Sequence, residues 1–88
     1  MFLEKINKNN LYNINYKCLF KIVVKNEICY GFITGYNSYM PQSLNGKGIP
    51  YGYYFRTINP HNIKEEIESN KWIDIELIEE IFLCHNLQ

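Results

Sequence analysis

The sequence predicts a mainly β domain with short helices: a small, strongly bent antiparallel barrel of five strands, with one helix between the third and fourth. Apolar and polar residues alternate with a period of two over much of the chain, which is typical of half-buried strands. Eight Tyr and five Phe occur among the 88 residues, and aromatic side chains favour sheets. A chain of this length forms one domain, so residues 1–88 are assigned to a single unit.

The alternation within residues 16–37 predicts the first hairpin. In YKCLFKIVVK one side of the strand carries Cys18, Phe20, Ile22 and Val24, and the lysines mark the other, wetter side. The following KNE predicts a tight turn, because Asn26 tolerates the positive φ that a two-residue hairpin requires. The second strand, ICYGFITGYN, places Gly31 and Gly35 on one face. A strand without side chains there can bend sharply, so we interpret this pair as the bend of the barrel.

The composition of the segments before and after this hairpin predicts their structure. Residues 1–15, MFLEKINKNNLYNIN, predict an N-terminal arm or a short helix. Residues 38–50 contain two Pro and two Gly and predict a long loop, which in a small domain is often functional. Residues 51–58, YGYYFRTI, then resume as the third strand.

The last third of the chain predicts a helix followed by a segment whose pattern fits two structures. In residues 59–70, Asn59 before Pro60 is typical of a helix start, and two isoleucines four residues apart fit one helical stripe. Residues 74–85 fit either a strand, turn and strand or one helix. We favour the two strands, with the turn at 78–80, because EIFLC is short and β-prone.

Composition favours a cytoplasmic protein without a cofactor or metal. The apolar runs are far shorter than the roughly 20 residues that a membrane span needs, so no membrane contact is expected. Cys18, Cys29 and Cys84 are odd in number and lie in apolar contexts, which predicts reduced, buried thiols. Cys84 and His85 are adjacent and would point to opposite faces of a strand, so they do not predict a zinc site.

The sequence also argues against catalysis. The stretch GFITG lacks the Lys and Ser or Thr of a phosphate-binding loop. His61 follows a proline at the expected helix start, and we interpret it as an exposed residue rather than as the base of a Cys–His pair. Nothing in the sequence separates the pKa values of the carboxylates into an acid and a base. We therefore predict that the protein is not an enzyme.

The residues around the glycine pair resemble the first motif of Sm-like proteins, a family of small barrels similar in shape to SH3-like domains. That motif runs as Gly, any residue, an aliphatic, often Gly, an aromatic, Asp, two variable residues, Met and Asn. The residues that stand in register with it are Gly31, Ile33, Gly35, Tyr36, Asn37, Tyr39 and Met40. The resemblance covers residues 16–84 in layout and implies a small bent barrel.

The departures from this pattern concern the RNA site of the family. Asn37 replaces the motif's Asp, and Pro41 replaces its RNA-contacting Asn. The second motif, a hydrophobic residue followed by a basic residue and Gly, has no counterpart in FLCHN. The resemblance therefore implies the scaffold of the family without its RNA-contacting residues.

We expect a non-enzymatic binding module, either a monomer or a small homo-oligomer, whose partner is another protein. Aromatic residues with Met and Arg are typical of interface cores, and they gather in the sequence around the long loop. The residues of this predicted aromatic face are Tyr39, Met40, Tyr51, Tyr53, Tyr54 and Arg56.

Two alternatives follow from the charges, which sum to zero but are uneven. Residues 1–56 carry seven Lys or Arg and two Glu, whereas residues 57–88 carry two Lys and seven Asp or Glu. The halves either interleave in space or form separate faces. An acidic face would suit a small inhibitor from a phage or mobile element, similar to anti-CRISPR proteins, that imitates nucleic acid. Its residues would be Glu65, Glu66, Glu68, Glu76, Glu79 and Glu80.

The second alternative is an Sm-like RNA-binding protein, in which lysines contact phosphates and tyrosines stack on bases. The bias toward Lys, Asn, Ile and Tyr fits a low-GC bacterium or its phage, which is the background expected for the inhibitor. The basic residues concerned are Lys17, Lys21, Lys25, Lys47 and Arg56.

Overall fold

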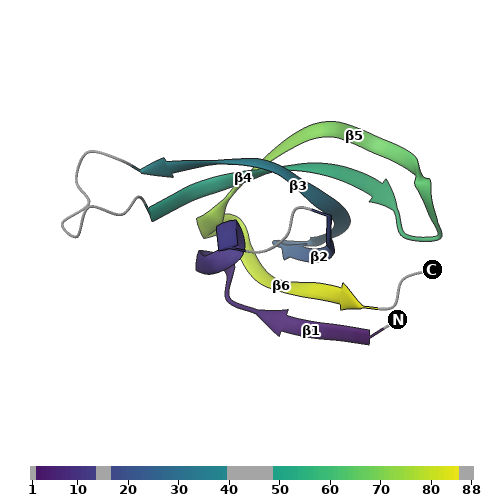
Figure 1. Ribbon diagram of the computed structural model, residues 1–88, viewed down its shortest axis with the longest axis horizontal. Helices are drawn as coiled ribbons and strands as arrows, with labels where there is room; N and C mark the ends of the chain where they lie inside the picture. The colour runs from purple at the N-terminus through teal and green to yellow at the C-terminus, as the bar shows by residue number, and fades with distance from the viewer. Residues whose placement is uncertain (1, 14–16, 40–48, 86–88) are drawn as a thin grey trace.

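The computed structural model describes residues 2–13, 17–39 and 49–85, and most of them lie in one antiparallel sheet (Figure 1). Six strands follow the order β1-β6-β2-β3-β4-β5 across this sheet. Two 3₁₀ helices, η1 and η2, interrupt the described strands. In chain order the elements are β1 (Phe2–Ile6), η1 (Lys8–Asn13), β2 (Leu19–Val24), β3 (Glu27–Tyr39), β4 (Ile49–Asn59), β5 (Asn62–Asp74), η2 (Ile75–Leu77) and β6 (Ile78–His85).

The predicted closed, five-stranded barrel is wrong: the sheet is open and has six strands. β1 and β5 are its edges, and no strand pairing joins them within the described residues. The sixth strand comes from the segment interpreted as an arm or a short helix, because Phe2–Ile6 pairs with β6. Alternation within a strand determines which side chains share a face, whereas closure depends on whether distant edges pair.

The predicted helix between the third and fourth strands is also wrong. Pro60 and His61 form a turn, and β5 runs from Asn62 along β4. Asn59, the expected helix cap, instead stabilises this turn: its Oδ1 accepts a hydrogen bond from the His61 N–H at 2.9 Å, and its Nδ2 donates to Glu65 Oε1 at 3.1 Å. A short helix with one thin apolar stripe gains little from packing, so pairing with β4 prevails.

Two local predictions are confirmed. β2 and β3 are joined by a two-residue turn in which Asn26 has a φ of 62°. The segment 74–85 forms a strand, a short turn and a strand, although the turn is Ile75–Leu77 and so begins three residues earlier than predicted. The shift follows from packing, because Ile78, the first residue of β6, is fully buried and lies opposite Val24 of β2.

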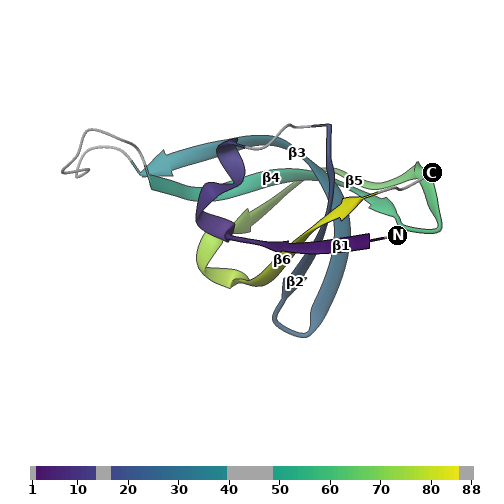
Figure 2. The ribbon, with the colours of Figure 1, turned by 60° about the horizontal axis from the view of Figure 1, so that its bottom comes forward.

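The sheet is strongly curled around its core. η2 has three residues, yet it leads from the edge strand β5 to β6, which lies beside the other edge. Such a short connection requires the two sides of the sheet to come close together, and Figures 1 and 2 show the β4–β5 hairpin facing β6 and β1. The buried residues of the enclosed main core are Leu11, Phe20, Ile22, Ile33, Tyr53, Phe55, Ile73, Ile75, Ile78 and Ile81.

η1 closes one end of this core beside η2, as both views show. The Tyr53 hydroxyl donates to the Lys8 carbonyl at 2.9 Å, and Lys8 Nζ donates to the Ile78 carbonyl at 2.8 Å. Leu11 is fully buried. Burying such a side chain contributes about 1.5–3 kcal/mol, so this helix is an integral part of the fold.

The two glycines of β3 have different surroundings. A Cβ on Gly31 would lie 2.8 Å from the backbone carbonyl oxygen of Arg56, so only glycine allows β4 to approach this closely. A Cβ on Gly35 would meet nothing nearer than the Tyr54 ring at 3.8 Å. The register between β3 and β4 shifts between Ile33 and Gly35, so the irregularity of the strand lies near the second glycine.

Candidate functional site

The residues of the predicted aromatic face do not form one surface. Tyr53 is fully buried in the main core, and its ring lies 6.2 Å from that of Phe55. Met40 lies outside the described residues. Tyr39 and Tyr51 occupy strand positions, but the structure describes only their backbone. Tyr54 and Arg56 alternate with buried residues of β4 and therefore lie on the face of the sheet opposite the main core.

Tyr54 and Arg56 pack against their neighbours in the sheet. The Tyr54 and Trp72 rings are 4.8 Å apart, and the Arg56 guanidinium lies 4.9 Å from the centre of the Phe32 ring. All four side chains are half-buried. Aromatic and cation–π pairs of this kind contribute about 0.5–1.5 kcal/mol each, and they hold strands β3, β4 and β5 together.

The acidic residues are divided between the two ends of β5. Glu65, Glu66 and Glu68 follow the β4–β5 turn, whereas Glu76 lies in η2 and the remaining two begin β6. Several also have local partners. Glu68 forms an ion pair with Lys71 at 3.3 Å, and Glu80 forms one with Lys5 at 3.2 Å. Glu79 and Glu80 therefore lie on a different strand from Glu65, Glu66 and Glu68, and two of the six carboxylates form ion pairs with lysines.

The basic residues of the nucleic-acid alternative are also engaged or dispersed. Lys21 Nζ lies 5.5 Å from the centre of the Phe82 ring, and Arg56 lies over Phe32. Both cations therefore pack against phenylalanine rings of the sheet. Lys25 lies in the β2–β3 turn, Lys17 precedes β2, and Lys47 is outside the described residues.

A groove of about 220 Å³ crosses β4 between the start of β3 and the middle of β5. Two isoleucines on its walls are exposed, Ile28 at 56% on β3 and Ile67 at 62% on β5. Its floor includes Thr57 and Ile58, which are 2% and 1% exposed. The lining residues are Glu27, Ile28, Cys29, Tyr30, Thr57, Ile58, Pro60, Ile67, Glu68 and Lys71.

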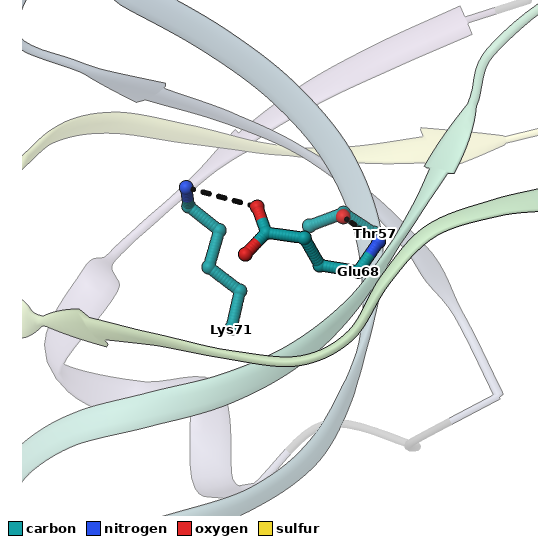
Figure 3. A network of polar contacts seen from close by, with 3 residues as sticks. All are labelled: Thr57, Glu68 and Lys71. Carbon is teal, nitrogen blue, oxygen red and sulfur yellow. Dashed lines mark hydrogen bonds and ion pairs between the residues drawn. The ribbon is translucent and has the colours of Figure 1, made fainter.

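A small polar network lies along the β5 side of the groove (Figure 3). The Glu68 N–H donates to Thr57 Oγ1 at 3.0 Å. The pairing register between β4 and β5 shifts at this position. Lys71 Nζ donates to Glu68 Oε1 at 3.3 Å, and this hydrogen bond raises the pKa of Lys71. The first hydrogen bond gives the buried Thr57 hydroxyl a partner. The second stabilises the charged form of Lys71.

The thiol of Cys29 lines the same groove. Burial raises the pKa of Cys29, and the nearby Lys71 ammonium only partly offsets this effect. The thiol is therefore protonated at neutral pH, and a protonated thiol is a poor nucleophile.

Sequence reasoning missed this groove, although one signal was present. Ile28 stands on the same face as Tyr30 and Phe32 in the alternation of the second strand, at its exposed beginning. Ile67 was assigned to a helical stripe and gave no such signal. The two come together only because β5 pairs with β4 and the sheet curls.

Comparison with protein-family models, with curated proteins and with solved structures finds no match for this chain. The resemblance to Sm-like proteins therefore stays a prediction from the motif alone. No helix within the described ranges is long and apolar enough to cross a membrane. In the same part of the chain, no group of three or more His, Cys, Asp or Glu is arranged to hold a metal ion. The thiols of Cys18, Cys29 and Cys84 are unpaired.

Proposed function

We propose that this chain is a protein-binding module whose contact site is the groove between β3 and β5. The observation that supports the proposal is the pair of exposed isoleucines, Ile28 and Ile67, on either side of a hollow with a buried floor. Exposed apolar side chains around a concave site are typical of interaction surfaces. Burying each isoleucine side chain contributes at most about 1.5–3 kcal/mol, which is enough for a specific contact of moderate strength.

The groove also restricts what the partner presents to it. A volume of about 220 Å³ admits one large side chain, and the apolar walls favour an aliphatic or aromatic one. Such an arrangement, with an anchor residue in a pocket and polar contacts at its rim, is common at protein interfaces. Glu27, Glu68 and Lys71 provide the polar rim.

The proposal is tested by comparing three variants in recovery of partners from a lysate of the source organism. We expect Ile28→Asp and Ile67→Asp each to reduce recovery of the partner at least tenfold. Leu77→Asp is the matched control, because Leu77 is 58% exposed but lies in η2, away from the groove. Circular dichroism confirms that each variant is folded. Equal recovery by all three folded variants would exclude the groove as the contact site.

A further inference from the structure

The outer edge of β5 is unpaired and fully accessible. β5 is last in the strand order, and β4 is its only partner among the described residues. Every residue from 61 to 70 is exposed. The free N–H and C=O groups of an edge strand are a template for pairing with another strand. The question is which strand fits this edge.

The side chains of this edge are complementary to those of a second copy that runs in the opposite direction. In an antiparallel pair of two β5 strands with Glu65 opposite Glu65, Ile63 faces Ile67 of the second copy and Lys64 faces Glu66. Each of these contacts occurs twice, because a two-fold axis repeats it. A two-fold interface requires this self-complementarity. Paired apolar residues and opposite charges across strands stabilise a sheet by roughly 0.2–1 kcal/mol each.

Other registers lack this match. With the axis at Ile67, Glu66 would face Glu68, and like charges opposite each other are destabilising. With the axis at Glu66, each isoleucine would face a polar residue, Glu65 or Ser69. The register centred on Glu65 is therefore favoured over these two.

The local contacts agree with this register. Neither Lys64 nor Glu66 takes part in an ion pair within the described part of the chain, so both charges are available to a second copy. The carboxylate of Glu65, which the axis would place opposite its own copy, is already bonded to Asn59 Nδ2 at 3.1 Å. That hydrogen bond directs it toward its own hairpin turn and reduces the repulsion at the axis.

We propose that two copies of this chain associate through antiparallel pairing of their β5 strands, with the two-fold axis at Glu65. Edge strands are often protected by charges and bulges, and β5 has both. The charges of this edge are not all of one sign, as Lys64 and Glu66 show. In the proposed register each of them faces the opposite charge on the second copy. In the dimer, Ile63 of the second copy lies beside Ile67 and extends that wall of the groove.

Charge reversal tests the register with the full chain itself. Sedimentation equilibrium over a concentration series measures the dimer dissociation constant of each protein. We expect Lys64→Glu and Glu66→Lys each to raise that constant at least about tenfold, which corresponds to 1.4 kcal/mol. The double variant restores it to within about threefold, because the charges are exchanged but still paired. An equimolar mixture of the two single variants forms a heterodimer.

Lys25→Glu is the control, because Lys25 is exposed in the β2–β3 turn, far from β5 in the strand order. It leaves the dissociation constant unchanged. Circular dichroism confirms the fold of each variant, so that a loss of pairing is not confused with unfolding. The proposal is overturned if the unmodified chain is monomeric up to about 1 mM. It is also overturned if the single variants dimerise as well as the unmodified chain.

Discussion

The two halves of β5 differ sharply in their exposure to solvent. From Asn62 to Asn70 every residue is exposed, whereas Ile73 is 4% exposed and the tilted Trp72 ring packs against Tyr54. One strand thus leaves the molecular surface and enters the core within a few residues. The second half stabilises the fold, and the first half is available for contacts. Each of the following experiments tests this division.

Truncation of the buried half has the largest expected effect. Ile73→Ala removes a nearly fully buried side chain, and the cavity left behind costs about 2–5 kcal/mol of unfolding free energy. Ile67→Ala, in the exposed half, changes stability by less than about 0.5 kcal/mol. Urea denaturation measures both. A similar loss in the two variants would show that the halves do not differ in their contribution to the fold.

Gly52→Ala tests the packing beneath Trp72. A Cβ at this position would collide with the Trp72 ring and lie 2.8 Å from the Ile73 carbonyl oxygen. We expect a loss of about 1–3 kcal/mol, because the ring or the strand must shift. Gly35→Ala is the control, since its nearest neighbour would be 3.8 Å away. Denaturation midpoints that fall equally in both variants would contradict the close packing of Trp72 on β4.

The thiol of Cys29 in β3 is influenced by Lys71, which lies where the exposed half of β5 ends and the buried half begins. Burial raises its pKa, so its alkylation rate reaches the half-maximum at a higher pH than that of an exposed thiol. Lys71→Ala raises the pKa of Cys29 further, because the ammonium favours the thiolate. The rate is measured against pH in a variant with Cys18 and Cys84 replaced by Ser. A half-maximum that moves to lower pH without Lys71 would contradict this contact.

The raised pKa of Cys29 also makes the stability of the fold depend on pH. A raised pKa in the folded state means that folding favours the protonated thiol. This contribution is complete below the unfolded pKa of about 8.5, and it is lost as pH rises through the folded value. Cys29→Ala therefore weakens the alkaline loss of stability. The measurement is the denaturation midpoint between neutral and alkaline pH, and an unchanged alkaline slope would contradict the assignment.

The ion pair between Glu68 and Lys71 has the smallest expected effect. Both side chains are partly exposed, and pairs of this kind contribute about 0.2–1 kcal/mol. Glu68→Gln should therefore lower stability slightly at low salt, and the difference should vanish near 1 M salt, where charges are screened. A loss of several kcal/mol that persists in high salt would show that the exposed half is structural.

The sequence predicted those parts of the fold that local patterns determine. The alternation around Phe20 and Ile22 and the turn at Asn26 correctly predicted the first hairpin. The isoleucines of residues 59–70 fit a helix locally, but pairing with β4 decided the conformation. The open form of the sheet could not be predicted, because it depends on whether distant edge strands pair.

The candidate site was less predictable than the fold. The run of tyrosines in β4 was correctly assigned to a strand, but alternation does not say which of the two faces is buried. Tyr53 is therefore in the core, although it was predicted on a contact surface. The groove requires Ile28 and Ile67, which are 39 positions apart, to meet across β4. No local pattern contains that information.

The place of β6 in the sheet has a consequence for the time course of folding. β6 lies between β1 and β2, so that Leu3 pairs with Cys84 at the other end of the chain. Contacts of such long sequence separation close large loops, and domains rich in them fold in milliseconds to seconds. During synthesis, β1 and β2 lack the strand between them until residue 85 has left the ribosome. The domain therefore completes its sheet only after translation has reached its last strand.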